Sequence, residues 1–199
     1  AFDPVAFCAA ALSREQARMR LELPLDATPV LGAVGRLVDG KGFGCLLEAF
    51  ASVSPDWPDA HLVIVGEGQA RAALEARIEQ LGLQGKVSLP GHLSDAATLY
   101  RAFDWVAIPS TQEGLGMILQ EAVMAGVPVL TSELAVFREQ LADTGWYAPS
   151  GEVQAWGDLI ARAFATSARE VLEVQSRALA PEQAWKNFSE TSRRLFSCR

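Results

Sequence analysis

The sequence of 199 residues lacks most of the features that would place it in a membrane or in an oxidising compartment. No apolar run approaches the roughly 18 residues that a bilayer-spanning helix needs, and the first residues lack the basic stretch of a signal peptide. The three cysteines, Cys8, Cys45 and Cys198, are far apart and match neither a disulfide framework nor a metal site. We therefore expect reduced thiols in a cytoplasmic protein, with no metal cofactor.

Basic residues are also scarce. The chain has 17 basic and 24 acidic side chains, a net charge of -7, and no basic run. Such a chain is a poor candidate for binding nucleic acid or an anionic membrane surface. A hydrophobic fraction of 50% and a charged fraction of 21% instead indicate one sizeable globular domain.

Short apolar runs alternate with amphipathic stretches along most of the chain. The runs are β-branched and do not alternate with polar residues, which is typical of strands covered on both faces. We predict six strands, at 30–34, 62–65, 87–89, 105–108, 127–130 and 146–148. Helices are predicted between them, at 43–53, 69–81, 95–103, 117–125 and 136–141. This order predicts a doubly wound α/β domain with a parallel sheet and helices on both faces.

The two ends of the chain lack this strand rhythm. We divide the sequence into a helical lead-in at 1–28, the α/β domain at 29–150 and C-terminal helices at 151–199. Helical spacing is clear for a group around Trp156 and looser for Trp185, Phe188 and Leu195. The C-terminal helices are expected to pack on the sheet domain or to cross to a second domain.

Glycines and polar residues concentrate in the segments that follow the predicted strands. These segments are Gly35–Gly42, Gly66–Gly68, Pro90–Leu93, Pro109–Gly116 and Thr131–Glu133. In a parallel sheet all of them emerge at the same edge, where doubly wound proteins bind ligands. We therefore expect one site at that edge.

The first of these segments carries two cations, Arg36 and Lys41, in a chain with only three lysines. Both side chains suit phosphate oxygens, although two solvated loop charges are the simpler alternative. The segment nearly matches the P-loop pattern, but Gly42 stands where the magnesium-binding hydroxyl belongs. This disfavours an ATPase or GTPase.

The fourth segment, Glu113-Gly114-Leu115-Gly116, opens directly into a predicted helix, whose N-terminus would favour an anion. Glu113 and, eight residues later, Glu121 are acceptors that suit sugar hydroxyls rather than phosphates. Backbone N–H donors that suit an anion thus lie beside carboxylate acceptors that suit a diol. This combination matches a nucleotide-sugar, which carries a diphosphate between two sugars. An exposed helix residue is the alternative for Glu121. A partial dinucleotide fingerprint at Gly66–Arg71 lacks its third glycine and is weak.

Taken together, these motifs resemble the C-terminal, donor-binding domain of the retaining GT-B glycosyltransferases of family 4, the group 1 glycosyl transferases. The resemblance covers nearly the whole chain. It rests on the following stretches: Val34–Leu37 with Lys41-Gly42, Ile64–Gly68, Pro109-Ser110, the E-x7-E pair from Glu113 to Glu121, and Ala125–Val129. Leu115 stands where many members have Phe.

The resemblance implies a role for each site residue. Arg36 and Lys41, with Gly35 beside them, would hold the donor diphosphate and stabilise the leaving phosphate. Glu113 would bind the transferred sugar and act with the two cations in catalysis. The remaining expected contacts are the backbone of Gly114, Leu115 and Gly116 to sugar and phosphate, Glu121 to the ribose, and His92 and Leu93 to the base; a surface histidine is an equal alternative for His92.

The resemblance also implies a second domain that binds the acceptor. We expect the 199-residue chain to bind a UDP-, GDP- or ADP-sugar weakly and to transfer nothing alone. It would need no metal, and any contact with the inner membrane would come through the other domain. Polysaccharide or lipopolysaccharide synthesis is a common setting. A GT-B-like epimerase or phosphorylase and a non-catalytic binding module remain alternatives.

Overall fold

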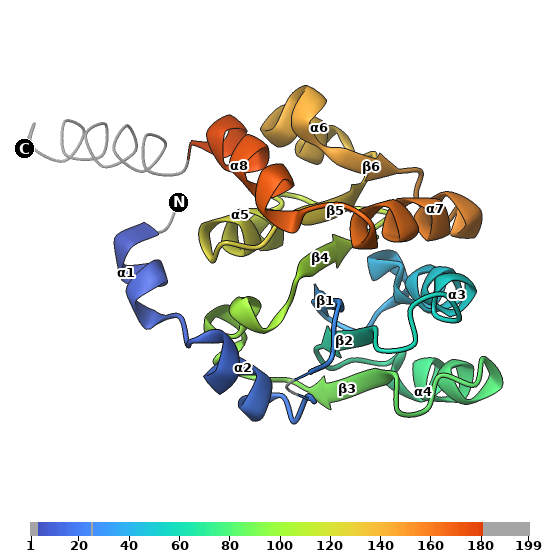
Figure 1. Cartoon of the computed structure of the whole chain (residues 1–199). Helices are drawn as coiled ribbons and strands as arrows, with labels where there is room; N and C mark the ends of the chain where they lie inside the picture. Colours follow the sequence, from blue (N-terminus) through green and yellow to red (C-terminus); the bar gives the residue numbers. More distant parts are fainter. Residues whose placement is uncertain (1–3, 25, 181–199) are drawn as a thin grey trace, which may run out of the picture.

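A computed structural model describes residues 4–24 and 26–180. Its centre is a sheet of six parallel strands in the order β3-β2-β1-β4-β5-β6 (Figure 1). The strands are β1 (Val30–Val34), β2 (His61–Val65), β3 (Val87–Gly91), β4 (Trp105–Ile108), β5 (Val129–Ser132) and β6 (Trp146–Ala148). The order reverses between β1 and β4, as in doubly wound folds. The prediction of a doubly wound parallel α/β sheet is confirmed.

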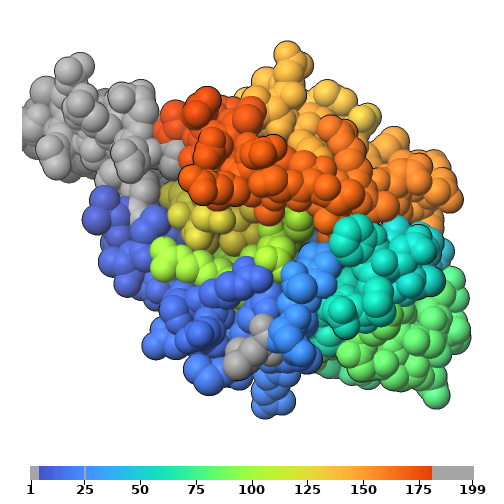
Figure 2. Space-filling model, in the orientation of Figure 1, coloured from blue at the N-terminus to red at the C-terminus, as the bar shows by residue number. Residues whose placement is uncertain are grey.

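Helices cover both faces of this sheet (Figure 1). They are α1 (Pro4–Ala10), α2 (Arg14–Arg20), α3 (Phe43–Val53), α4 (Arg71–Gln80), α5 (Met117–Met124), α6 (Ala135–Leu141), α7 (Val153–Phe164) and α8 (Ala168–Leu179). In the space-filling view α7 packs against α3, and α8 against α5 (Figure 2). None of the helices in the described part of the chain is long and apolar enough to cross a membrane.

Two apolar cores separate the helices from the sheet, because successive strand residues point to opposite faces. Leu31, Ile64 and Trp105 lie in the core with α3, α4 and α7. Val30 and Val106 lie in the other, with α2, α5 and α6. Burial of both faces explains why the strands read as continuous apolar runs.

The lead-in segment is fixed to the sheet by α2. Ser13 caps this helix in a capping box with Gln16. Arg18, 3% exposed, donates to the Ala102 and Ala27 carbonyls and pairs with Asp104 at 3.3 Å. Asp104 also accepts a hydrogen bond from the Val30 amide at the start of β1. These contacts join the lead-in to the edge of the sheet opposite the polar loops.

One predicted helix is wrong. Residues 95–103 form two 3₁₀ turns, Ala96–Thr98 and Tyr100–Ala102. The Thr98 carbonyl accepts from the Leu12 amide, and the Ala102 amide turns to the Leu99 carbonyl instead. The Thr98 carbonyl, which an α-helix would pair with the Ala102 amide, is thus bonded to the lead-in segment, and the turn tightens to i→i+3 bonding.

The fifth strand begins two residues later than predicted. The Val127 amide donates to the Ala122 carbonyl at the end of α5, so it is not available to the sheet. Pro128 has no amide hydrogen to donate to the sheet. As a result Thr131 and Ser132, expected in the following loop, lie buried in β5. The predicted spacing of Trp185, Phe188 and Leu195 lies outside the described residues.

Candidate functional site

The candidate site lies where the strand order reverses. β1 and β4 are neighbours, and they lead into Gly35–Gly42 and Pro109–Gly116 respectively. Helices that follow two such strands cover opposite faces of the sheet, so a crevice opens between the loops at the carboxyl ends of the strands. The topology therefore places the cation-bearing and the carboxylate-bearing segments side by side.

Close backbone packing holds these two loops together. The Thr111 amide donates to the Gly40 carbonyl at 2.9 Å. Gly42 has a φ of +69°, and a Cβ built on it would lie 2.1 Å from the Pro109 carbonyl oxygen. Only glycine fits both the left-handed backbone and this approach. Lys41, which directly precedes Gly42, therefore lies against the loop Pro109–Gly116 that follows β4.

Lys41 and Glu113 form an ion pair across the crevice between Lys41 Nζ and Glu113 Oε1. Their side chains are only 18% and 15% exposed. Ser110 Oγ donates to the same Glu113 oxygen at 2.9 Å. The structure therefore brings together two of the three side chains for which the resemblance implied a catalytic role.

The third, Arg36, is exposed and borders a cavity of about 250 Å³. The cavity runs over the ends of β1, β2 and β3, and the predicted residues Gly35, His92 and Leu93 line it. Gly35, which lines the cavity, also lies beside Lys41, because a Cβ built on it would lie 3.6 Å from the Lys41 side chain. Arg36, His92 and Leu93 thus lie on the side of the crevice away from Glu113.

Glu121 lies inside α5 and accepts a hydrogen bond from the Tyr100 hydroxyl at 2.8 Å. Burial raises the pKa of the Glu121 carboxyl, and this hydrogen bond opposes the shift. Burial and then the charge of Glu121 raise the pKa of Tyr100 well above its usual value. Tyr100 therefore keeps its proton and acts as the donor.

The turn before α5 contains Gly114, Leu115 and Gly116. Leu115 is 73% exposed, and its carbonyl accepts from Gln140 Nε2 at 3.1 Å. Gln140 in turn accepts from Gln120 at 3.1 Å. This amide chain ties the entrance of α5 to α6 and fixes the turn.

Sequence reasoning missed the polar side chains that stand behind the site: Tyr100, Gln140 and Ser132. Ser132 is fully buried and donates to the Ser110 carbonyl at 2.5 Å. Ser110 stood in a predicted loop but received no role of its own. A polar residue ending an apolar run, as Ser132 does, is the one signal that could have indicated a buried contact.

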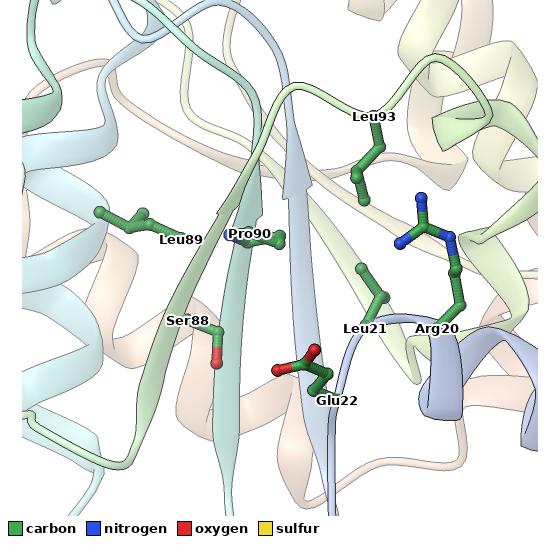
Figure 3. Close-up of a pocket in the computed structure, with 7 residues that line it drawn as sticks. All are labelled: Arg20, Leu21, Glu22, Ser88, Leu89, Pro90 and Leu93. Atoms are coloured by element: carbon green, nitrogen blue, oxygen red, sulfur yellow. The ribbon is translucent and has the colours of Figure 1, made fainter.

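A second cavity, of about 360 Å³, lies beside β3 and shares Leu93 with the first. Leu21, Glu22 and Pro90 surround it, and the Arg20 side chain lies next to it (Figure 3). Arg20 pairs with Asp95 at 3.5 Å. Within the described ranges, 4–24 and 26–180, no group of three or more metal-ligating side chains is found.

Comparison with known proteins agrees with this architecture. Residues 15–184 match the family model described as "Glycosyl transferases group 1". The chain belongs to the group 1 glycosyltransferases. One relative in this family is the D-inositol 3-phosphate glycosyltransferase of Corynebacterium urealyticum, which is 30% identical over 188 residues. The match covers 87% of this chain and 43% of that protein.

Two solved structures share the fold, and one of them, WaaG, is described as a glycosyltransferase. WaaG, described as involved in lipopolysaccharide biosynthesis, matches 86% of this chain with a TM-score of 0.74 and 26% identity. Anabaena HepE, solved with UDP and glucose, matches 94% with a TM-score of 0.73 and 24% identity. The chain covers 49% and 55% of these proteins, so it spans about half their length. The described sheet is that of a GT-B C-terminal domain.

Proposed function

We propose that this chain is the donor-binding domain of a retaining glycosyltransferase that uses a nucleotide-diphosphate sugar. The observation that carries the proposal is the ion pair of Lys41 and Glu113 at the switch point between β1 and β4. A cation and a carboxylate at one point can take the two chemically different parts of such a donor, its diphosphate and its sugar hydroxyls.

The cavity beside this pair suits the nucleoside. In the proposed complex Lys41 turns from Glu113 to the diphosphate, and Arg36 at the cavity mouth supplies the second cation. Both oppose the negative charge that grows on the leaving phosphate, a form of preorganised electrostatic stabilisation. His92 and Leu93, which also line the cavity, lie next to the base in this complex.

The carboxylates bind the two sugars of the donor. Glu113, released from Lys41, accepts hydrogen bonds from hydroxyls of the transferred sugar, and Glu121 accepts them from the ribose. The amides at Gly114, Leu115 and Gly116 lie in the turn directly before α5 and offer hydrogen-bond donors to sugar and phosphate. No step of this scheme uses a metal.

The chain spans about half of its relatives, and we propose that transfer also requires an acceptor-binding domain. Sugar transfer by the 199-residue chain alone to any acceptor would contradict this part. WaaG is described as acting in lipopolysaccharide biosynthesis, and we propose a surface polysaccharide or lipopolysaccharide as the product of the whole enzyme.

Calorimetric titration of the 199-residue chain with UDP, GDP and ADP tests the donor site. We expect one of the three to bind, and its sugar conjugate to bind more tightly because Glu113 adds contacts. Arg36→Ala should weaken binding of the nucleotide about tenfold, since a charge-assisted contact to phosphate is lost. The matched control Arg77→Ala, on α4 at an ion pair with Glu48, should bind normally. Failure of all three nucleotides to bind would contradict the proposal.

A further inference from the structure

Each of the two carboxylates proposed to bind the donor has its own buried hydroxyl. Ser110 Oγ lies 2.9 Å from Glu113 Oε1, and Tyr100 OH lies 2.8 Å from Glu121 Oε2. Both donors are 1% exposed, whereas both carboxylates are partly exposed. The hydroxyls therefore lie behind the carboxylates, on the side of the core.

Packing and hydrogen bonds hold these hydroxyls in place. The Ser110 carbonyl accepts from Ser132 Oγ at 2.5 Å and from Ser150 Oγ at 3.2 Å, so three successive strand ends fix its position. The Tyr100 ring meets Phe103 edge-on with 6.4 Å between centroids. A donor whose own rotamer is fixed by its neighbours holds its acceptor in one orientation.

One oxygen of each carboxylate is therefore occupied before any ligand arrives. Glu113 Oε1 accepts from Ser110 as well as from Lys41, and Glu121 Oε2 accepts from Tyr100. No residue of the described chain donates to the other oxygen of either carboxylate. A fixed carboxylate with one free oxygen loses less rotational entropy when it accepts a hydrogen bond from a ligand.

We propose that Ser110 and Tyr100 are positioning residues of the donor site, which act on different parts of the donor. Ser110 orients Glu113 towards the transferred sugar, and Tyr100 orients Glu121 towards the ribose. This inference rests on the proposed function, and it adds a prediction that the function alone does not make. Loss of either hydroxyl should weaken binding of one part of the donor only.

Ser110→Ala and Tyr100→Phe each remove one hydroxyl and leave the surrounding packing filled. The 199-residue chain and both variants are titrated with UDP, UDP-glucose and 2′,3′-dideoxy-UDP. Two matched controls remove equivalent hydroxyls elsewhere. Ser54→Ala removes a donor to the Ala51 carbonyl at the end of α3, and Tyr147→Phe, in β6, removes a donor to the Ala142 carbonyl.

Ser110→Ala is expected to weaken the binding of UDP-glucose about tenfold and to leave the affinity for UDP unchanged. Tyr100→Phe is expected to weaken the binding of UDP and of UDP-glucose equally, also by about tenfold. The affinity for 2′,3′-dideoxy-UDP, which lacks the ribose hydroxyls, should stay unchanged. A purely structural role would weaken all three ligands together. If GDP or ADP is the nucleotide that binds, the same three ligands are used with guanosine or adenosine in place of uridine.

The outcomes separate the two proposals. If the unchanged chain binds UDP-glucose more tightly than UDP but neither variant differs from its control, the positioning inference is overturned and the function stands. Equal weakening of all three ligands also overturns it. If the unchanged chain binds no nucleotide, the proposed function fails, and the positioning inference fails with it. Thermal unfolding of each variant verifies that the fold is retained.

Discussion

The two halves of the sheet build their sides of the crevice by different means. The half formed by β1, β2 and β3 supplies the cations and the cavity, and its loops depend on glycines that let backbones touch. The half formed by β4, β5 and β6 supplies the carboxylates, which buried side-chain hydroxyls hold. Charge can therefore be placed either by backbone shape or by second-layer hydrogen bonds, and mutations should distinguish the two.

The largest effect is expected where backbone shape decides. Gly42→Ala should lower the free energy of unfolding by about 3 kcal/mol, because it combines an unfavourable left-handed residue with a Cβ overlapping the Pro109 carbonyl. Urea denaturation measures it. Gly44→Ala is the matched control, since a Cβ there meets nothing within 4 Å. This control should stabilise α3 by about 0.5 to 1 kcal/mol. Similar changes in the free energy of unfolding for Gly42→Ala and Gly44→Ala would show that backbone shape does not hold the first half of the crevice.

Lys41→Met tests whether the cation of the first half serves the diphosphate. The affinity for the bound nucleotide should fall about 30-fold, or about 2 kcal/mol, through loss of a charge-assisted contact. Lys86→Met is the control, because Lys86 lies before β3 at the opposite edge and donates to the Ser54 carbonyl. Titration calorimetry of both variants decides the matter. An unchanged affinity in Lys41→Met would assign the diphosphate to other residues.

Ser132→Ala tests the hydrogen-bonded support of the second half. It should cost about 1 kcal/mol of stability, the usual worth of one buried hydrogen bond. Ser150 continues to donate to the Ser110 carbonyl, so collapse of the loop is not expected. Chemical denaturation gives the stability, and Ser94→Ala, at an exposed position in a turn, offers a control. A cost above about 3 kcal/mol would show that β5 itself, rather than the loop, depends on this hydroxyl.

The smallest effect concerns the pH dependence of stability at Glu121. Burial raises the pKa of this carboxyl, so the folded protein keeps the proton to higher pH than the unfolded chain. Its ionisation therefore lowers stability as pH rises from about 4.3, the usual pKa of a free glutamate, through the raised value. Glu121→Gln removes that cost and should be more stable than the unchanged chain at pH 7.

This advantage should shrink as pH falls towards 5, which denaturation midpoints at several pH values would reveal. Glu79→Gln, at an exposed position of α4, is the control and should show no such trend. A Glu121→Gln variant that is less stable at pH 7 would mean that the bond from Tyr100 outweighs burial.

Much of the site could be predicted because its parts follow strands. Lys41 and Glu113 were expected near each other from the rule that loops at the carboxyl ends of parallel strands converge, and they form an ion pair. Tyr100 could not be placed in the same way. Its segment has a helical pattern in the sequence but forms two 3₁₀ turns, and the Thr98 carbonyl accepts from the Leu12 amide of the lead-in segment.

The amino-acid sequence alone determined the sheet, the family and the loops that carry charge, because apolar periodicity and glycine spacing are local properties. Only the tertiary structure decided which distant acceptor each of the buried hydroxyls of Ser132 and Tyr100 meets. Ser132 reaches Ser110 from 22 positions away, and Tyr100 reaches Glu121 from 21. Such contacts depend on the strand register and on the first residue of β5, which Pro128 shifts. Neither property can be read from the hydrophobic periodicity of the sequence.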